Sequence, residues 1–281
     1  MTSQTQRPLV SVIIPAHDEE AVIERCLTAL LRDAAPGELE VIVATNGCSD
    51  RTAEIARSVA PDCTVLELSA ASKIAALNAG DAAASCFPRA YLDADVQLDT
   101  ASLRRVIEAM EPGTVLCAAP EMRLDLHGRP WFVRRFFRAF RALPYLSDAL
   151  VGNGLYILSE DGRSRFDRFP SITADDLFIR NLFVGDERAT VGGSEFVVHP
   201  PKTLRGLLAI RERTYRGNDE YRDRGFRSHA GRTDDRRRMV AVARRQPLDL
   251  AVFLAVNIAA KIRLRTRRTA VRWERDDSAR S

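Results

Sequence analysis

The chain contains few cysteines and no apolar run long enough to cross a membrane. Five cysteines are scattered through 281 residues, at positions 26, 48, 63, 86 and 117, without a CxxC pair. This spacing argues against a disulfide framework or a zinc site and indicates a reducing compartment. In the basic C-terminal region, the longest uncharged stretch is the eleven residues between Asp249 and Lys261. A membrane-spanning helix needs about 20.

The sequence signatures of several common protein classes are also missing. The first residues, MTSQTQRPLV, contain one arginine and no long apolar stretch, so we expect no signal peptide. We find no internal repeat of the kind that builds solenoids and no low-complexity segment. No GxGxxG follows the first predicted strand and no GxxxxGK[ST] occurs, which disfavours a standard dinucleotide-binding fold and a P-loop NTPase.

Charge is distributed unevenly along the chain. The composition, 46% hydrophobic and 28% charged, is that of a globular protein and excludes a disordered one. The formal net charge is +4, but residues 201–281 hold 22 Lys and Arg against 10 Asp and Glu. The preceding 200 residues are therefore acidic. A basic C-terminal region on an acidic body predicts contact with something anionic.

Apolar runs and helical periods alternate through the first hundred residues. The predicted strands are 9–14, 40–45, 64–68 and 90–96, and the helices between them are 21–32, 52–60 and 72–86. This alternation predicts an α/β fold with a parallel, doubly wound sheet. Ligands bind such sheets beyond the carboxyl ends of the strands. Polar residues follow three of the strands, at 15–19, 46–50 and 93–95, so we expect the site there.

Asp93 and Asp95 end the fourth predicted strand. On an extended strand, residues two apart point to the same side, where two carboxylates repel unless a cation lies near them. Mg²⁺ and Mn²⁺ prefer carboxylate and phosphate oxygens. The pair therefore indicates a divalent metal that holds a diphosphate, and the alternative is a strand-end turn with solvated acids.

Four segments together resemble a known family. VSVIIPAHDEEAVIERCLTAL, VIVATNGCSDRTAEIA, KIAALNAG and YLDADV are similar, in order and spacing, to family 2 of the glycosyltransferases. The resemblance covers residues 8–100 and continues to about residue 218. It implies the GT-A fold, a Rossmann-like, mostly parallel sheet flanked by helices that binds a nucleotide sugar.

The resemblance also implies a donor site residue by residue. Asn78 and Gly80 match the segment that lies along the nucleotide. Asn46 stands where the family more often has an Asp that contacts the base. Asparagine keeps an acceptor oxygen there but loses the charge. The nucleotide-binding residues would be Pro15, Ala16, His17, Glu19, Asn46, Asp50, Lys73 and Asp93. The metal, Mn²⁺ or Mg²⁺, would be held by Asp95 and Asp93.

Asp175 and Asp176 precede a helical pattern in the second half of the chain. Acids in the first turn of a helix are favoured by the helix dipole and stay ionised, so they suit a simple helix cap. An ionised carboxylate can also take the proton of an attacking acceptor hydroxyl. The segment resembles the Glu-Asp motif of inverting family members. We therefore predict Asp176, in preference to Asp175, as the catalytic base.

Three further residues are candidates for the metal and the diphosphate. His199 follows another predicted strand and is either a third metal ligand, a diphosphate contact or a packed strand-end residue. Arg213 and Arg216 share a helix face, and arginine suits a departing diphosphate. They resemble the segment that carries a Gln-x-x-Arg-Trp motif in processive relatives, but Gln and Trp are absent here. A solvated charged helix is the alternative.

Two helical segments combine apolar and basic residues. RPWFVRRFFRAFRALPYL (129–146) suits either a membrane-interface helix or a helix that packs on the domain. In residues 248–273, an apolar stretch precedes a basic flank. It suits either an amphipathic helix on anionic lipid or a terminal helix docked on the catalytic domain. Because no nucleic-acid-binding motif accompanies the basic region, we expect no nucleic-acid partner.

Together these features predict a metal-dependent inverting glycosyltransferase of the hexosyltransferase type. It would transfer a sugar from a nucleoside diphosphate donor to a lipid-linked or glycan acceptor in cell-envelope glycan biosynthesis. We expect residues 1–100 to bind the nucleotide sugar, 101–220 the acceptor, and 221–281 to form a basic helical extension. The expected location is cytoplasmic, peripheral at the inner face of the membrane. A retaining transferase with the same metal site and a non-catalytic membrane-associated scaffold are the alternatives.

Overall fold

The computed structural model describes residues 7–142, 154–226 and 244–266. The chain divides into two compact units that are interleaved in sequence. The first unit comprises residues 1–123, 152–171 and 182–198, and the second comprises 124–151, 172–181 and 199–281. The predicted functional division at residues 100 and 220 stays a prediction.

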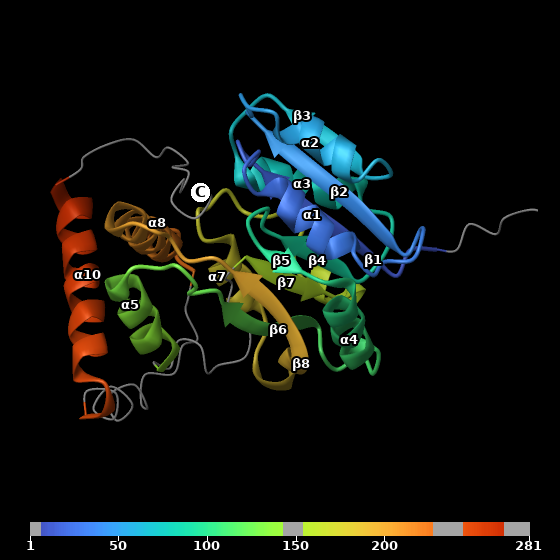
Figure 1. Ribbon diagram of the computed structural model, residues 1–281. Helices are drawn as coiled ribbons and strands as arrows, with labels where there is room; N and C mark the ends of the chain where they lie inside the picture. Colours follow the sequence, from blue (N-terminus) through green and yellow to red (C-terminus); the bar gives the residue numbers. More distant parts are fainter. Residues whose placement is uncertain (1–6, 143–153, 227–243, 267–281) are drawn as a thin grey trace, which may run out of the picture. The chain divides into compact units, whose positions relative to one another are not determined.

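An eight-stranded sheet forms the first unit, with strand order β3-β2-β1-β4-β7-β6-β8-β5 (Figure 1). Strands β3, β2, β1 and β4 pair in parallel, whereas β7 runs antiparallel to both β4 and β6, and β5 runs antiparallel to β8. The strands are β1 (Val10–Ala16), β2 (Leu39–Asn46), β3 (Thr64–Leu68), β4 (Arg89–Leu92), β5 (Gln97–Leu98), β6 (Cys117–Leu124), β7 (Leu155–Leu158) and β8 (Arg188–Val198).

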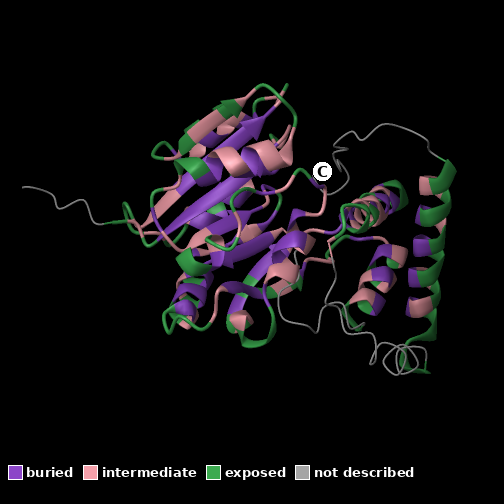
Figure 2. Ribbon diagram, turned by 180° about the vertical axis from the view of Figure 1, so that it is seen from behind, coloured by how far each residue is buried: buried purple, intermediate pink, exposed green. Residues whose placement is uncertain are grey.

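Helices cover both faces of this sheet, because alternate residues of a strand point to opposite sides. Val12 and Ile14 of β1 pack in one apolar cluster with residues of helix α1, including Leu27. Ile13 points the other way, toward α3, where a Cβ on Gly80 would come within 2.5 Å of its Cγ2 atom. Figure 2 shows the central strands buried. The helices of the unit are α1 (Ile23–Leu31), α2 (Thr52–Val59), α3 (Lys73–Ala83), α4 (Thr100–Met110), α6 (Glu160–Arg163) and the 3₁₀ turn η2 (Gly185–Glu187).

The α/β fold with a mostly parallel sheet confirms the predicted fold class. One local prediction was wrong: the fourth strand ends at Leu92, so Asp93 and Asp95 do not lie on an extended strand as the argument from residues 90–96 assumed. The backbone N–H of Val96 donates to the carbonyl of Asp93 at 3.1 Å, which closes a turn. The run at residues 151–159 reads as a strand and contains β7, but its antiparallel direction was not foreseen, because a short buried run gives no signal of direction.

Helices dominate the second unit, which holds α5 (Trp131–Ala142), most of α7 (Asp175–Leu182), α8 (Leu204–Asp223) and α10 (Pro247–Thr266). Val133, Phe136 and Ala139 of α5 are buried in one cluster with residues of α8 and α10. The phenylalanine-rich face of α5 therefore packs on other helices, which was one of the two alternatives for this segment. Residues 143–146 of the predicted helix lie outside the described part. Among the described helices, none is long and apolar enough to cross a membrane.

A buried acid anchors α3 inside the first unit. Asp81 is 6% exposed and accepts hydrogen bonds from Arg163 at 2.7 Å, from Arg89 at 2.8 Å and from the hydroxyl of Tyr91. Burial by itself would raise the pKa of Asp81, but the hydrogen bonds from Arg163, Tyr91 and Arg89 outweigh it, so the pKa lies below its ordinary value. Asp81 thus joins α3 to β4 and α6.

We predict that Asp81→Asn destabilises the first unit at neutral pH by about 3–5 kcal/mol, because it leaves Arg89 and Arg163, whose side chains are only 13% exposed, without their carboxylate. Because the folded-state pKa is lowered, the contribution of Asp81 is present above its unfolded pKa, near 4, and is lost as pH falls below that value. Urea unfolding at pH 7 and pH 3 should therefore show a large deficit at pH 7 and a smaller one at pH 3. Asp62→Asn, at an exposed position, is the control. An equal deficit at both pH values would contradict this account.

Candidate active site

The loop after β1 is tied to the loop after β2. Pro15 and Ala16 are the last, buried residues of β1. The Nδ1 atom of His17 lies 2.6 Å from the carbonyl oxygen of Asn46, and the backbone N–H of Glu19 donates to the Thr52 hydroxyl at 2.7 Å. The two loops predicted to hold the nucleoside therefore form one connected layer.

Asn46 is fully buried, and its amide bridges backbone segments. Its Nδ2 donates to the carbonyl of Ala16 at 2.8 Å, and its Oδ1 accepts from the N–H of Ser72 at 3.0 Å. A residue with no exposed surface presents nothing to a ligand without rearrangement. The side chain instead joins three loops: those after β1, β2 and β3.

Asp50 is also occupied by structural contacts. Its Oδ1 accepts from the N–H of Thr52 at 3.0 Å, near the start of α2, and its Oδ2 accepts from the N–H of Glu20 at 3.1 Å. Asp18, Cys48 and Asp50 bring three potential ligand atoms within 4.8 Å of one another. The Oδ1 of Asp18 accepts from the N–H of Ser49 at 2.6 Å. These hydrogen bonds show that the cluster links the loop after β1 to the loop after β2.

Asp93 and Asp95 both turn outward at the end of β4. Ala94 and Val96, which alternate with them, are 3% and 2% exposed and belong to the core, so they anchor the turn. The N–H of Asp93 donates to the carbonyl of Gly154 at 2.7 Å. Gly154 has φ +95°, and a Cβ there would lie 3.2 Å from Asp93 Oδ2. The positive φ and the Val96 Cγ2 atom, which a Cβ would approach to 2.7 Å, favour glycine at 154, beside the Asp93 carboxylate.

Lys73 contacts the first of these acids. Its Nζ lies 2.8 Å from Asp93 Oδ1, and both side chains are about one-third exposed, at 27% and 34%. Lys73 opens α3, whose start is capped by the Ser72 hydroxyl accepting from the N–H of Ala75 at 3.2 Å. The cap therefore fixes the start of α3, from which Lys73 reaches Asp93 after β4. Lys73 and Asp93 were both predicted to bind the nucleotide.

The environment of a buried cysteine shows which charges lie close together. Burial raises the pKa of Cys26 on α1, and the charges of Asp95, Asp93 and Glu19 raise it further, while Arg25 opposes them. The charges of Asp95, Asp93, Glu19 and Arg25 therefore all act on the same thiol of α1. That the loops after β1 and β4 form one site stays a prediction.

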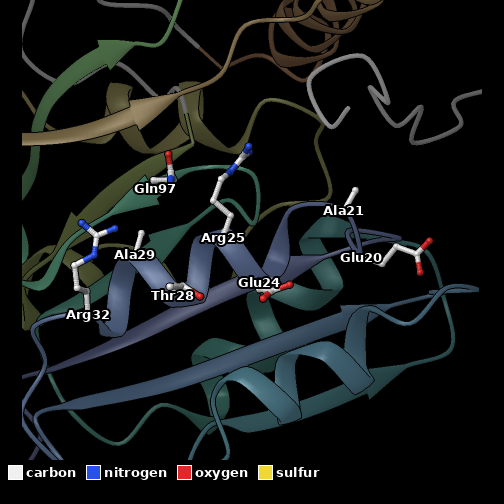
Figure 3. A pocket seen from close by; sticks show the side chains of 8 residues that line it. All are labelled: Glu20, Ala21, Glu24, Arg25, Thr28, Ala29, Arg32 and Gln97. Atoms are coloured by element: carbon white, nitrogen blue, oxygen red, sulfur yellow. The ribbon is translucent and has the colours of Figure 1, made fainter. Parts of the chain in front are cut away.

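Arg25 is a residue that the sequence patterns did not single out. Its Nε and one Nη atom are buried and have no hydrogen-bond partner among the described residues. It lines a hollow of about 350 Å³ whose lining side chains are shown in Figure 3. None of the predicted nucleotide or metal residues lines this hollow. The only available signal was a charge at an inward position of an otherwise apolar helix face.

Asp175 and Asp176 begin α7 in the second unit, as predicted. Asp175 is 3% exposed, whereas Asp176 is intermediate in exposure, and Asp176 Oδ1 accepts from the N–H of Leu177 at 2.7 Å. Of the two, Asp176 is thus the more accessible to an acceptor. The preceding loop is fixed by α8, because Glu220 Oε2 accepts from the N–H and hydroxyl of Thr173 at 2.9 and 2.8 Å.

His199 follows β8 and is held by an aspartate that follows β6. Its Nδ1 lies 3.2 Å from Asp125 Oδ2, and its side chain is 11% exposed. The pKa of Asp125 is lowered, first by a hydrogen bond from the N–H of His127 and also by the charge of His199. This pairing leaves Nε2 as the ring nitrogen that is not directed at Asp125. Asp125 was not among the predicted residues.

The arginines of α8 differ in whether they contact other helices. Arg211 donates to Asn257 Oδ1 of α10 at 2.9 Å, so it serves helix packing. Arg213 is exposed and Arg216 partly so, and within the described residues neither forms an ion pair or side-chain hydrogen bond. Both therefore remain available for an anionic ligand.

Helix α8 lies close to the loop that leads to Asp175. A Cβ on Gly217, which follows Arg216, would lie 3.1 Å from the Ala174 Cβ. A side chain at position 217 would therefore need the Ala174 loop to shift by a few tenths of an ångström. The second unit therefore brings the predicted diphosphate arginines and the predicted base onto neighbouring segments.

The predicted residues fall into two groups, one in each unit. The first unit brings together the loops that hold Pro15–Glu19, Asn46–Asp50, Lys73 and Asp93–Asp95. The second unit contains Asp175, Asp176, His199, Arg213 and Arg216. The first unit is thus an α/β unit whose polar loops and outward carboxylates follow the carboxyl ends of its parallel strands.

Residues 11–156, just over half of the chain, match the model of Glycosyl transferase family 2, and the chain belongs to this family. Over 107 residues it is 32% identical to the "Uncharacterized glycosyltransferase EpsJ" of Bacillus subtilis, which is 37% of this chain and 31% of that protein. It is 38% identical to the "Glycosyltransferase AglE" of Haloferax volcanii over 93 residues, which is 31% of each. The chain spans about a third of the length of these curated relatives.

Solved structures share the fold at lower sequence identity. A mannosyltransferase of Pyrobaculum calidifontis, solved in complex with GDP-Man and Mn²⁺, superposes with a TM-score of 0.60 at 19% identity, covering 95% of this chain and 77% of that one. The glucosyl-3-phosphoglycerate synthase of Mycobacterium tuberculosis, solved with Mn²⁺, UDP-glucose and glycerol 3-phosphate, gives 0.57 at 20% identity, covering 80% and 83%. These likenesses confirm the GT-A fold.

Proposed function

We propose that the protein is a metal-dependent, inverting glycosyltransferase that uses a nucleoside diphosphate sugar as donor. The observation that carries the proposal is the anchored turn after β4, which turns Asp93 and Asp95 outward with Lys73 beside them. Two carboxylates and a lysine at the carboxyl edge of a parallel sheet suit a metal-bound diphosphate. The relatives crystallised with Mn²⁺ and nucleotide sugars support the same donor chemistry.

The donor set fits Mn²⁺ or Mg²⁺. Asp93 and Asp95 offer hard carboxylate oxygens, and such metals commonly take one or two protein carboxylates together with substrate phosphates. His199 is proposed as a third ligand through Nε2. Asp125, on Nδ1, would then fix the ring orientation, as carboxylates do for many metal-bound histidines. When bound, the metal would neutralise charge on the diphosphate as it leaves.

Other residues would bind the donor and move the proton. The layer formed by His17, Glu19 and Asn46 would shape the nucleoside site, with Pro15, Ala16 and Asp50 acting through the backbone. Lys73 would contact the diphosphate, as would Arg213 and Arg216. Asp176 would accept the proton of the acceptor hydroxyl as that oxygen attacks the anomeric carbon. The acceptor is proposed to be lipid-linked or a glycan, at the cytoplasmic face of the membrane.

A panel of nucleotide sugars tests this function by thermal shift. We expect one donor to raise Tm only when Mn²⁺ or Mg²⁺ is present, since a ligand at 100 times its Kd adds about 2.7 kcal/mol to stability. For units of this size that is on the order of 5–10 °C. Metal alone and donor with EDTA are the controls. If no nucleotide sugar shifts Tm with either metal, the non-catalytic scaffold replaces the enzyme. The anomeric configuration of a transfer product separates inverting from retaining chemistry.

A further inference from the structure

Helix α10 is apolar on two sides, and the described helices of the second unit cover only one of them. Phe253, Val256 and Ala260 are at most 9% exposed and pack against α5 and α8. On the other side, Leu254, Ile258 and Ile262 are 45%, 58% and 57% exposed, and Leu248 is 63% exposed. Figure 2 shows buried and exposed stretches alternating along this helix. A helix that is apolar all round is normally buried, so the exposed stripe indicates a surface that binds a partner.

The inner side of α10 also forms polar contacts with α5 and α8. Asp249 is buried and pairs with Arg135 of α5 at 2.9 Å. Arg263 pairs with the buried Glu212 of α8 at 2.8 Å. Asn257 accepts from Arg211 and from the hydroxyl of Tyr215, at 2.9 and 2.7 Å. These contacts fix the rotation of α10, so the side turned to solvent is determined by the packing.

The exposed side of α10 carries cations at both ends and no acid. Arg244 and Arg245 are exposed just before the helix, and Arg265 is exposed toward its far end. Lys261 is exposed there too, although its Nζ also lies 5.0 Å from the centre of the Tyr215 ring of α8. Between the two ends lie the apolar stripe and two exposed alanines, at positions 251 and 255. Because the other side of α10 is covered by α5 and α8, the exposed apolar strip with its flanking cations suits a helix that lies in the plane of a membrane surface.

We propose that the exposed side of α10 binds an anionic lipid surface, with Leu254, Ile258 and Ile262 entering the headgroup region. Each exposed Lys or Arg adds favourable energy only against an anionic surface, which sets the chemistry of the partner. A second copy of this chain fits less well. In either orientation of two α10 helices, the cationic end of one helix would meet a cationic end of the other, with no exposed acid on α10 to compensate. This inference rests on the membrane location that is part of the proposed function. It does not depend on the proposed sugar-transfer reaction.

Co-sedimentation with vesicles tests the assignment. The intact chain should bind vesicles that contain one-third phosphatidylglycerol and should bind pure phosphatidylcholine at least about tenfold more weakly. Leu254→Ser with Ile258→Ser should lower binding to the anionic vesicles by about tenfold or more, because binding scales with buried apolar area. Lys261→Gln with Arg265→Gln should lower it and reduce its sensitivity to salt.

Val184→Ser is the matched control, because Val184 is 53% exposed but lies in the first unit. It should leave vesicle binding unchanged. Equal binding of the intact chain and the Leu254/Ile258 variant would overturn the proposal. So would a concentration-dependent dimer in light scattering that this variant abolishes, since a second copy would then cover the stripe. The metal-dependent thermal shift of a donor is measured on the same variant, so a failure of lipid binding is distinguishable from a failure of the donor site.

Discussion

Asp93→Asn should lower sugar transfer on the order of 10³-fold, because it removes a carboxylate from the proposed metal site. Loss of a metal's charge stabilisation is worth several kcal/mol in the transition state, and each 1.36 kcal/mol is about tenfold in rate. The change also removes the partner of Lys73, whose Nζ lies 2.8 Å from Asp93 Oδ1. Transfer rates should therefore fall together with the metal-dependent part of the donor's thermal shift.

The effect on metal binding is measured apart from activity. Mn²⁺ titration followed by electron paramagnetic resonance should show weaker binding in Asp93→Asn and in Asp95→Asn, and His199→Ala tests the third proposed ligand in the same way. Asp62→Asn, which exchanges the same groups at an exposed position, should bind and transfer like the original chain. Full transfer by Asp93→Asn, or transfer that EDTA does not affect, would remove the metal from the proposal.

Asp176→Asn should lower kcat by about 10²–10⁴-fold and leave donor binding intact, since general base catalysis acts on the chemical step. Asn keeps the size of the side chain and an acceptor oxygen but cannot take up the proton. The metal-dependent donor shift in Tm should match that of the original chain. This separation of kcat from donor binding distinguishes a base from a residue that only supports the fold.

Two comparisons sharpen the test of the base. Asp223→Asn, at an exposed position at the end of α8, should leave kcat unchanged. Asp175→Asn alters a residue that is 3% exposed, so we expect it to lower stability more than Asp176→Asn does. If Asp176→Asn retained full activity and the product kept the anomeric configuration of the donor, the retaining alternative would be correct.

The sequence predicted the first unit well because its signals are local. Continuous apolar runs followed by polar loops identified four strands whose carboxyl ends lie at one edge of a sheet, and this edge placed Asp93 and Asp95 near Lys73. The prediction failed at the fourth strand, which stops at Leu92. The acids still point outward, because the burial of Ala94 and Val96 imposes the alternation that an extended strand would have given.

Sequence patterns could not predict contacts between segments that are far apart in the chain. Nothing in the local sequence indicates that Asn46 is fully buried between backbone groups, or that Asp125 reaches His199. The same holds for the basic residues near the C-terminus. Arg263 is taken up by Glu212 and Arg211 by Asn257, whereas Lys261 and Arg265 remain exposed. Composition does not distinguish these four residues, because only the packing of the helices decides which of them are paired and which are exposed.

The sequence by itself determined the family, the order of strands and helices in the first half, and the residue types of the proposed metal and diphosphate site, because each depends on neighbours within a few positions. Only the tertiary structure decided which side chains are turned inward. On α10, hydrophobicity is spread around the helix, so no periodicity marks a buried side. The pairing of Asp249 with Arg135 and of Glu212 with Arg263 fixes its rotation, and the apolar stripe left outside follows from that packing.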